Sequence, residues 1–155
     1  MNWNVTGKSR LHGRVGYLNQ NYNRSGVQNF SGLNGRLDWD WTPTGKTLVN
    51  LAAYRELYNS ELAGSDHEEV TGTSARAQWQ VLPKVALGAM FSYDNNKYSG
   101  TTLDENIRSA GLNATYKPWS GGNITLSVQN QRRRSNNSLR EFDATVLNLS
   151  ALLQF

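Results

Sequence analysis

The fold is decided by one stretch of the sequence, Leu33-Asn34-Gly35-Arg36-Leu37-Asp38-Trp39-Asp40-Trp41. Apolar or small residues occupy every second position of this stretch, and polar or charged residues occupy the positions between them. Successive side chains of a β-strand point to opposite sides, so a period of two predicts a strand with one apolar and one polar face.

The same pattern returns at a spacing of 38 residues. Trp3, Trp41 and Trp79 lie 38 residues apart, and two more steps lead past Lys117 to Phe155, the last residue. Runs with period two fill the intervals, and they centre on Leu11–Tyr17, Leu33–Trp41, Val49–Ala53, Thr73–Val81, Val85–Tyr93, Ala110–Tyr116, Ile124–Val128 and Leu147–Phe155. We therefore expect eight antiparallel strands, arranged as four 38-residue hairpins, after a stub of a preceding strand and turn at residues 1–8.

The predicted connections alternate between short and long. Short turns at residues 6–9, 43–46, 82–84 and 117–123 contain Gly or Pro, as turn geometry requires. Longer polar segments cover residues 22–29, 59–69, 94–105 and 133–140. This alternation is typical of up-and-down barrels of the outer membrane, which have short periplasmic turns and longer external loops.

The composition permits such a barrel. Hydrophobic residues make up 37% of the 155 residues, the net charge is +4 and the mean hydropathy is −0.63. That is too polar for a transmembrane helix, which needs about 18 consecutive apolar residues, but a barrel strand needs apolar side chains only at alternate positions. Cysteine is absent, which excludes disulfides, thiol nucleophiles and thiolate metal sites.

Charge placement favours a membrane barrel over a soluble antiparallel β-sandwich. The middle of the predicted apolar face carries no charged residue, and Arg55, Arg108 and Asp143 fall on that face only near the long-loop end. A charge at the bilayer midplane costs about 2–4 kcal/mol and little near the interface. Aromatic residues mark the predicted membrane interface, mainly at the short-turn end: Trp39, Trp41, Trp79, Tyr116, Trp119 and Phe155. A soluble sandwich with core aromatics is the alternative.

The opposite face suits a wet lumen. The residues predicted to line it are Arg14, Arg36, Asp38, Asp40, Glu56, Arg76, Gln78 and Gln80. Opposite charges on neighbouring strands can pair there.

The chain reads as one β-barrel domain, residues 1–155, that forms the C-terminal strands of a larger barrel. Its first residues, Met1-Asn2-Trp3-Asn4, do not resemble a signal peptide. Its last strand ends at Phe155, which resembles the C-terminal signal that the barrel assembly machinery recognises. We expect a place in the outer membrane of a Gram-negative bacterium.

No arrangement of residues predicts catalysis, a cofactor or a metal. His12 falls on the polar face and is interpreted as a lumen side chain. Residues 65–69, Ser-Asp-His-Glu-Glu, could offer oxygen ligands to a divalent cation, but a solvated acidic loop is the preferred interpretation. Asp38 and Asp40 share a face as glycosidase carboxylates do, yet pairing with Arg36 or Arg76 is preferred because no sugar cleft is indicated.

Four arginines near the external rim form the sharpest charge cluster: Arg132, Arg133, Arg134 and Arg140. Guanidinium groups bind phosphates through paired hydrogen bonds, so contact with lipopolysaccharide or an acidic polysaccharide is one interpretation, and a solvated cluster is the other. No stacking aromatic residue accompanies the triplet, and we do not expect a nucleic-acid partner.

Two segments carry a resemblance to a known family. Residues 37–47, Leu-Asp-Trp-Asp-Trp-Thr-Pro-Thr-Gly-Lys-Thr, and residues 76–84, Arg-Ala-Gln-Trp-Gln-Val-Leu-Pro-Lys, resemble the putative β-barrel porins associated with exopolysaccharide-biosynthesis operons. The resemblance implies a role in polysaccharide export or assembly at the outer membrane and brings no catalytic residues. We therefore expect a polar-lined passage for exopolysaccharide. A closed barrel whose external loops bind a surface ligand is the alternative.

Overall fold

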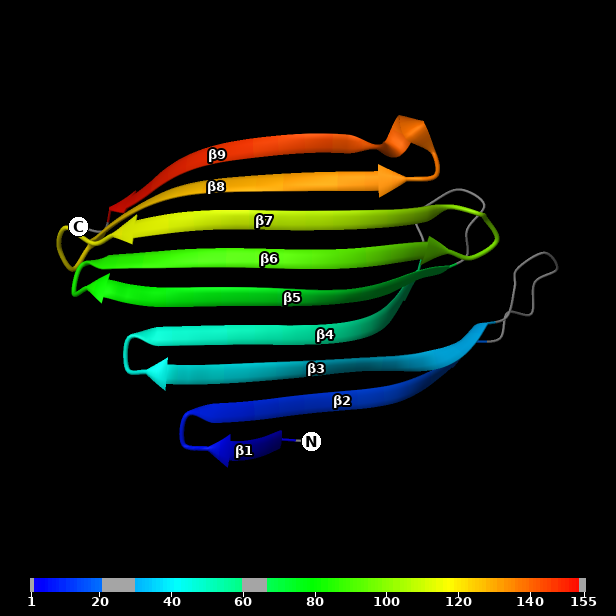
Figure 1. Cartoon of the computed structure of the whole chain (residues 1–155), viewed down its shortest axis with the longest axis horizontal. Coiled ribbons are helices and arrows are strands. Elements are labelled where there is room, and N and C mark those ends of the chain that lie inside the picture. The colour runs from blue at the N-terminus through cyan, green and yellow to red at the C-terminus, as the bar shows by residue number, and fades with distance from the viewer. Residues whose placement is uncertain (1, 21–29, 60–66, 154–155) are drawn as a thin grey trace.

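The computed structural model describes residues 2–20, 30–59 and 67–153, and they form one antiparallel sheet. Nine strands lie side by side in the order of the chain, so the topology is a simple up-and-down meander (Figure 1). Their bounds are β1 Asn2–Thr6, β2 Ser9–Gln20, β3 Phe30–Thr44, β4 Thr47–Asn59, β5 His67–Leu82, β6 Val85–Tyr98, β7 Asp104–Tyr116, β8 Gly122–Ser135 and β9 Phe142–Leu153. A single 3₁₀ turn, η1 (Ser138–Arg140), connects β8 to β9. The sheet is open, because β1 and β9 form its two edges.

The strand register aligns the apolar positions across the sheet. From β3 to β9, one row of cross-strand neighbours contains only apolar residues: Trp41, Val49, Ala77, Ala89, Leu112, Val128 and Leu147. The next row belongs to the opposite face and is mostly polar: Arg10, Asp40, Asn50, Arg76, Met90, Gly111, Gln129 and Val146. A slip of one residue would interchange the two faces, so the alternation in each strand fixes the register of its neighbours.

The apolar face has no cover. In the described part of the chain no second sheet packs on it, and Val15, Leu147 and Leu149 are at least 70% exposed. Ala86 is the one buried hydrophobic residue among those described. The alternative of a soluble sandwich requires the Leu and Trp side chains to meet between two sheets, and the fold does not contain that core.

The strands are staggered in the way a barrel requires. A row of neighbours that starts at Leu11, close to the short-turn end of β2, passes Phe91 and reaches Asn130, beyond the middle of β8. Closing a sheet into a barrel requires such a tilt of the strands with respect to the axis. The all-β, antiparallel, up-and-down architecture predicted from the sequence is confirmed, in a sheet that is not closed.

The short turns repeat the same local structure. The pairs β1–β2, β3–β4 and β5–β6 are each joined by two residues that end in a lysine (Lys8, Lys46 and Lys84), and the register shifts just before each turn. The turn between β7 and β8 is longer and covers residues 117–121. All four lie at the left end of the sheet in Figure 1.

The long connections are shorter than the sequence predicted. Strand β6 continues to Tyr98 and β7 begins at Asp104, so most of the predicted loop 94–105 is strand, and β8 takes Arg133 and Arg134 from the predicted loop 133–140. Strand β5 begins at His67, inside the predicted loop 59–69, whereas the predicted loop 22–29 lies outside the described residues. The prediction was wrong because a bilayer needs only about 9–11 residues of a tilted strand. Strands of 14 and 16 residues extend past it with polar side chains on both faces.

Candidate pore-lining face and rim

All eight residues predicted to line a lumen lie on the polar face of the sheet. Glu56 on β4 connects three of the strands there. The Arg14 guanidinium on β2 donates a hydrogen bond to Glu56, the hydroxyl of Tyr58 donates another at 2.6 Å, and Arg36 Nη1 on β3 lies 3.9 Å away. One carboxylate thus balances two guanidinium groups that face each other directly across β2 and β3.

A second polar contact on this face spans strand β5 at a glycine. The hydroxyl of Tyr54 on β4 donates to Asp94 Oδ1 on β6 at 2.5 Å, although β5 lies between the two strands. The crossing position on β5 is Gly72, where a Cβ atom would lie 2.3 Å from Asp94 Oδ1 and 2.8 Å from the Tyr54 ring. The Arg36 guanidinium covers that ring at 5.0 Å, a distance typical of a cation–π contact.

Three of the remaining predicted lumen residues, Asp38, Asp40 and Gln80, have local partners. Arg36 Nε donates to both carboxylate oxygens of Asp38 at 2.9 and 3.0 Å, which confirms the predicted pairing. Asp40 accepts a hydrogen bond from Asn50 at 2.5 Å instead of pairing with Arg76. The two carboxylates are thus held in separate polar contacts. On β5, Gln80 Nε2 donates to the carbonyl of Leu82 at 2.7 Å.

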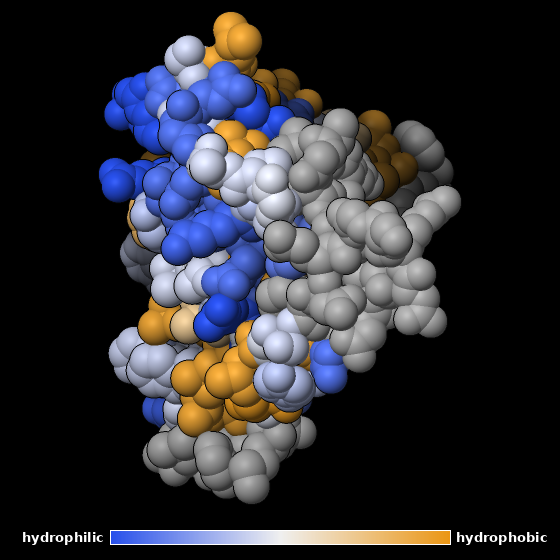
Figure 2. Space-filling view, turned by 90° about the vertical axis from the view of Figure 1, so that its right-hand side faces the viewer, coloured by the Kyte–Doolittle hydropathy of each residue, from blue (hydrophilic) through white to orange (hydrophobic). Residues whose placement is uncertain are grey.

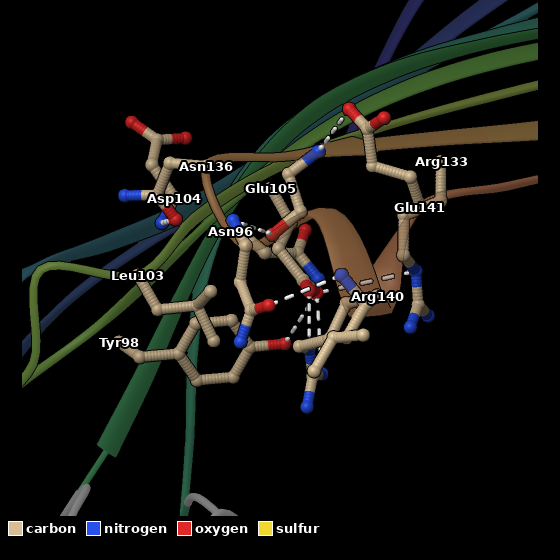
Figure 3. Close-up of polar contacts among 12 residues, drawn as sticks. Asn96, Tyr98, Leu103, Asp104, Glu105, Arg133, Asn136, Arg140 and Glu141 are labelled. Atoms are coloured by element: carbon tan, nitrogen blue, oxygen red, sulfur yellow. Dashed lines mark hydrogen bonds and ion pairs between the residues drawn. The ribbon is translucent and has the colours of Figure 1, made fainter.

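The rim at the long-loop end is built around Glu105, whose side chain is fully buried (Figure 3). Arg140 Nε, on η1, donates to Glu105 Oε1 at 2.5 Å, and the Tyr98 hydroxyl donates to Glu105 Oε2 at 3.2 Å. Arg133 Nε on β8 lies 3.9 Å from the same carboxylate. The side chain of Asn137 accepts a hydrogen bond from Leu139 N and caps the 3₁₀ turn that brings Arg140 inward.

The rim cluster lies beyond the apolar belt, at the ends of β6 and β7. Burial alone would raise the pKa of Glu105, but the hydrogen bond from Arg140 and the charges of Arg133 and Arg140 outweigh it and lower that pKa below its ordinary value. Burial and the nearby Glu68 carboxylate raise the pKa of Tyr98 to about 12. Glu105 is therefore ionised at neutral pH, and the Tyr98 hydroxyl keeps the proton that it donates.

The four arginines grouped by the sequence prediction do not form one cluster. Side chains alternate along β8, so Arg133 shares the polar face with Glu105, whereas Arg132 and Arg134 lie on the opposite face. Arg132 Nη2 is 2.7 Å from Asp143 Oδ2, and Arg134 Nη1 is 3.3 Å from Glu141 Oε2. Arg140 joins Arg133 on Glu105. Each guanidinium group of this set has an acidic neighbour within the chain.

Sequence reasoning placed Arg108 on the apolar face near the long-loop end but missed that it lies directly opposite Arg132. Its guanidinium covers the ring of Tyr93 at 5.4 Å, and in the described part of the chain no carboxylate lies within ion-pair distance of it. Glu105 and Gly72 were also missed. The period of two along Arg132–Arg134 could have separated the triplet, but no sequence pattern predicts that η1 turns Arg140 inward.

The described aromatic residues of the predicted interface gather at the short-turn end. Trp39 and Trp41 stack on β3 with ring centroids 5.9 Å apart, and Trp39 Nε1 donates to Ser9 Oγ at 2.6 Å. Trp79 lies on the same face of β5 and is half-exposed, as are Tyr116 at the end of β7 and Trp119 in the following turn. Phe155 lies outside the described residues. The five described residues of this set are therefore positioned near one end of the apolar belt.

The predicted acidic loop has internal partners where it is described. Glu68 accepts a hydrogen bond from Asn96 at 2.7 Å, and Glu69 Oε2 lies 2.8 Å from Arg55 Nη2. Ser65 and Asp66 lie outside the described residues. His12 is on the polar face of β2, opposite Asp38. Among the described residues no three His, Cys, Asp or Glu side chains converge as metal ligands would.

The described residues contain no helix with the length and apolar character needed to cross a bilayer. Comparison with curated proteins finds no match. Comparison with protein-family models finds one that covers nearly the whole chain, from residue 5 to residue 155, a range that includes strands β2 to β9. On that evidence the chain belongs to the family "Putative beta-barrel porin 2".

Proposed function

We propose that this protein forms part of an outer-membrane barrel through which an exopolysaccharide passes along a polar wall, without a reaction. The observation that carries the proposal is the separation of the two faces. The apolar rows can meet hydrocarbon, and the opposite rows offer charged groups, amides and hydroxyls in register across the sheet. Outer-membrane barrels alternate apolar and polar residues in this way.

Planar-bilayer conductance of the intact protein tests the passage. We expect discrete conductance steps that fall when exopolysaccharide oligomers are added, because a sugar chain in the lumen displaces ions. A chromosomal deletion should retain the polysaccharide inside the cell envelope. Folded, inserted protein that conducts no ions and does not affect export would contradict the proposal.

Contact with lipopolysaccharide is a second proposal. The sequence assigned it to four arginines near the rim, and we now assign it to Arg108, Arg132 and Arg134. These three lie on the apolar face near the long-loop end, and Arg108 and Arg132 are like charges directly opposite each other. Such a pair destabilises a sheet unless anions compensate it. Asp143 compensates Arg132, and a lipid phosphate on the membrane side could compensate Arg108.

The double variant Arg108→Gln/Arg132→Gln should bind less lipopolysaccharide in native mass spectra, while Arg133→Gln, which faces the other way, should not. Equal loss in both would contradict this contact.

For assembly, removal of Phe155 should slow folding by the barrel assembly machinery. An unchanged folding rate would contradict that role of the C-terminal residue.

A further inference from the structure

The polar face is hollowed at its short-turn end. A hollow of about 640 Å³ lies between the turn before β2, the turn before β4 and the last residues of β5, and its polar lining includes Lys8, Lys46, Thr42, Thr44, Gln78 and Gln80. A second hollow of about 490 Å³ shares Lys8 and Thr42 and adds Arg10 and Asp40. Together they form a continuous recess beside the first two turns, here called the turn-end recess.

The 38-residue repeat places the lysines of this recess. Each short turn ends in a lysine whose carbonyl accepts a hydrogen bond from the next hairpin: Lys8 from Thr42 N at 2.8 Å, Lys46 from Gln80 N at 2.8 Å and Lys84 from Lys117 N at 2.9 Å. These bonds hold each turn against its neighbour, so the lysines form a row at the short-turn end of the sheet. The Lys84 ammonium donates to the carbonyl of Pro118 at 2.6 Å, which keeps its charge at the rim.

This end of the sheet is strongly basic. Residues 1–10, 41–48, 77–93 and 109–128 contain Lys8, Arg10, Lys46, Lys84 and Lys117 but no aspartate or glutamate. Asp40, the one acidic residue that lines the recess, already accepts a hydrogen bond from Asn50. A concave surface lined by one sign of charge concentrates counter-ions and raises their rate of association.

We propose that the turn-end recess binds a polysaccharide that carries carboxylate groups, at the entrance of the passage. This inference rests on the proposed function and names the class of its substrate. Lys8 and Lys46 would bind the carboxylates, and the Thr42 hydroxyl and Gln78 amide would bond to sugar hydroxyls. The recess opens on the polar face, whereas Trp79, which marks the membrane side, lies on the other face. A sugar chain in the lumen therefore fits it better than a lipid headgroup does.

The test uses the intact protein, reconstituted in planar bilayers and also held in detergent micelles. Oligogalacturonate and a neutral malto-oligosaccharide of the same length serve as probes. We expect oligogalacturonate to block conductance at about tenfold lower concentration than the neutral sugar, with a difference that shrinks at high salt. The block should be stronger from the short-turn side. In micelles, fluorescence anisotropy should show binding of labelled oligogalacturonate.

The decisive variant is Lys8→Gln/Lys46→Gln, which removes two cations from solvent-exposed turns. It should weaken oligogalacturonate binding about tenfold and leave neutral-sugar block unchanged. The matched control, Arg55→Gln/Lys97→Gln, removes two cations from the opposite end and should keep wild-type binding. Heat-shifted electrophoretic mobility checks that both variants fold.

The outcomes separate this inference from the passage itself. If the protein conducts ions but oligogalacturonate neither blocks nor binds it, the proposed binding in the turn-end recess is wrong and the proposed passage stands. If the protein conducts no ions but binds oligogalacturonate, and the double variant loses that binding, the proposed passage is wrong and the proposed binding in the recess stands. If the double variant loses affinity only for anionic-lipid vesicles, the lysines contact lipid and the inference is wrong.

Discussion

The two ends of the sheet carry charge in opposite ways. At the long-loop end, arginines and carboxylates are interleaved, and Arg132, Arg133, Arg134 and Arg140 each have an acidic neighbour, with Glu105 fully buried among them. At the short-turn end, the ammonium groups of Lys8 and Lys84 donate to the backbone carbonyls of Pro43 and Pro118. Figure 2 views the long-loop end and shows hydrophilic residues over much of its described surface.

This difference separates structural charge from charge that a ligand can use. Ion pairs within the rim satisfy each other and hold β8, η1 and β9 together. The carbonyl of Pro118 does not neutralise the Lys84 ammonium that contacts it, so the field of Lys84 extends into solvent. The comparison predicts that substitutions among the residues paired around Glu105 change stability, whereas substitutions of the short-turn lysines change ligand binding.

The largest expected effect is on Glu105. Glu105→Ala leaves Arg133 and Arg140 without their carboxylate. Breaking a buried ion pair costs about 3–5 kcal/mol, and because both arginines keep some exposure we expect a loss of about 2–3 kcal/mol in the free energy of unfolding. Urea unfolding in lipid vesicles, followed by tryptophan fluorescence, measures it. The control is Glu141→Ala, whose pair with Arg134 is more exposed and should contribute under about 1 kcal/mol. Equal losses would remove the distinction between the ends.

Polar contacts between side chains continue from the long-loop end toward the middle of the sheet, where the Tyr54–Asp94 hydrogen bond lies over Gly72. In Gly72→Leu the new side chain would occupy the space where Tyr54 reaches Asp94, so that hydrogen bond must break and the ring must move. Overpacking of this kind costs about 1–3 kcal/mol. Gly45→Ala is the matched control, because a Cβ atom there meets nothing within 4 Å. The same urea titration distinguishes the two variants. An unchanged unfolding midpoint for Gly72→Leu would contradict the Tyr54–Asp94 contact over Gly72.

The rim should also respond to acid. The pKa of Glu105 is lower in the folded protein than in the unfolded chain, so its ionised form stabilises the fold above the ordinary glutamate pKa of about 4.3. That contribution is lost as the pH falls through the folded value. The difference in unfolding free energy between wild type and Glu105→Gln should therefore be constant near neutral pH and shrink below about pH 4. A difference that is independent of pH would show that Glu105 acts by packing and not by charge.

The sequence predicted the two faces well and the rim poorly, for physical reasons. Alternation survives in any strand that has lipid on one side, so Leu37, Trp39 and Trp41 could be placed from the sequence alone. Beyond the bilayer both faces are polar, the pattern disappears, and strand extension through Tyr98 and Arg134 is not visible in it. The partners of Glu105 depend on the inward path of η1, which is a tertiary feature.

The smallest expected effect on stability is at the short-turn end. Lys84→Met removes one exposed hydrogen bond, from Lys84 Nζ to the carbonyl of Pro118, and leaves the backbone bond between Lys84 and Lys117 intact. The free energy of unfolding should fall by about 0.5–1 kcal/mol, close to the limit of detection. The same substitution should shift the zero-current potential in a salt gradient toward lower preference for anions, because a cation leaves the mouth of the passage. A large loss of stability with an unchanged zero-current potential would reverse the roles of the two ends, since Lys84 would then be a structural residue like Glu105.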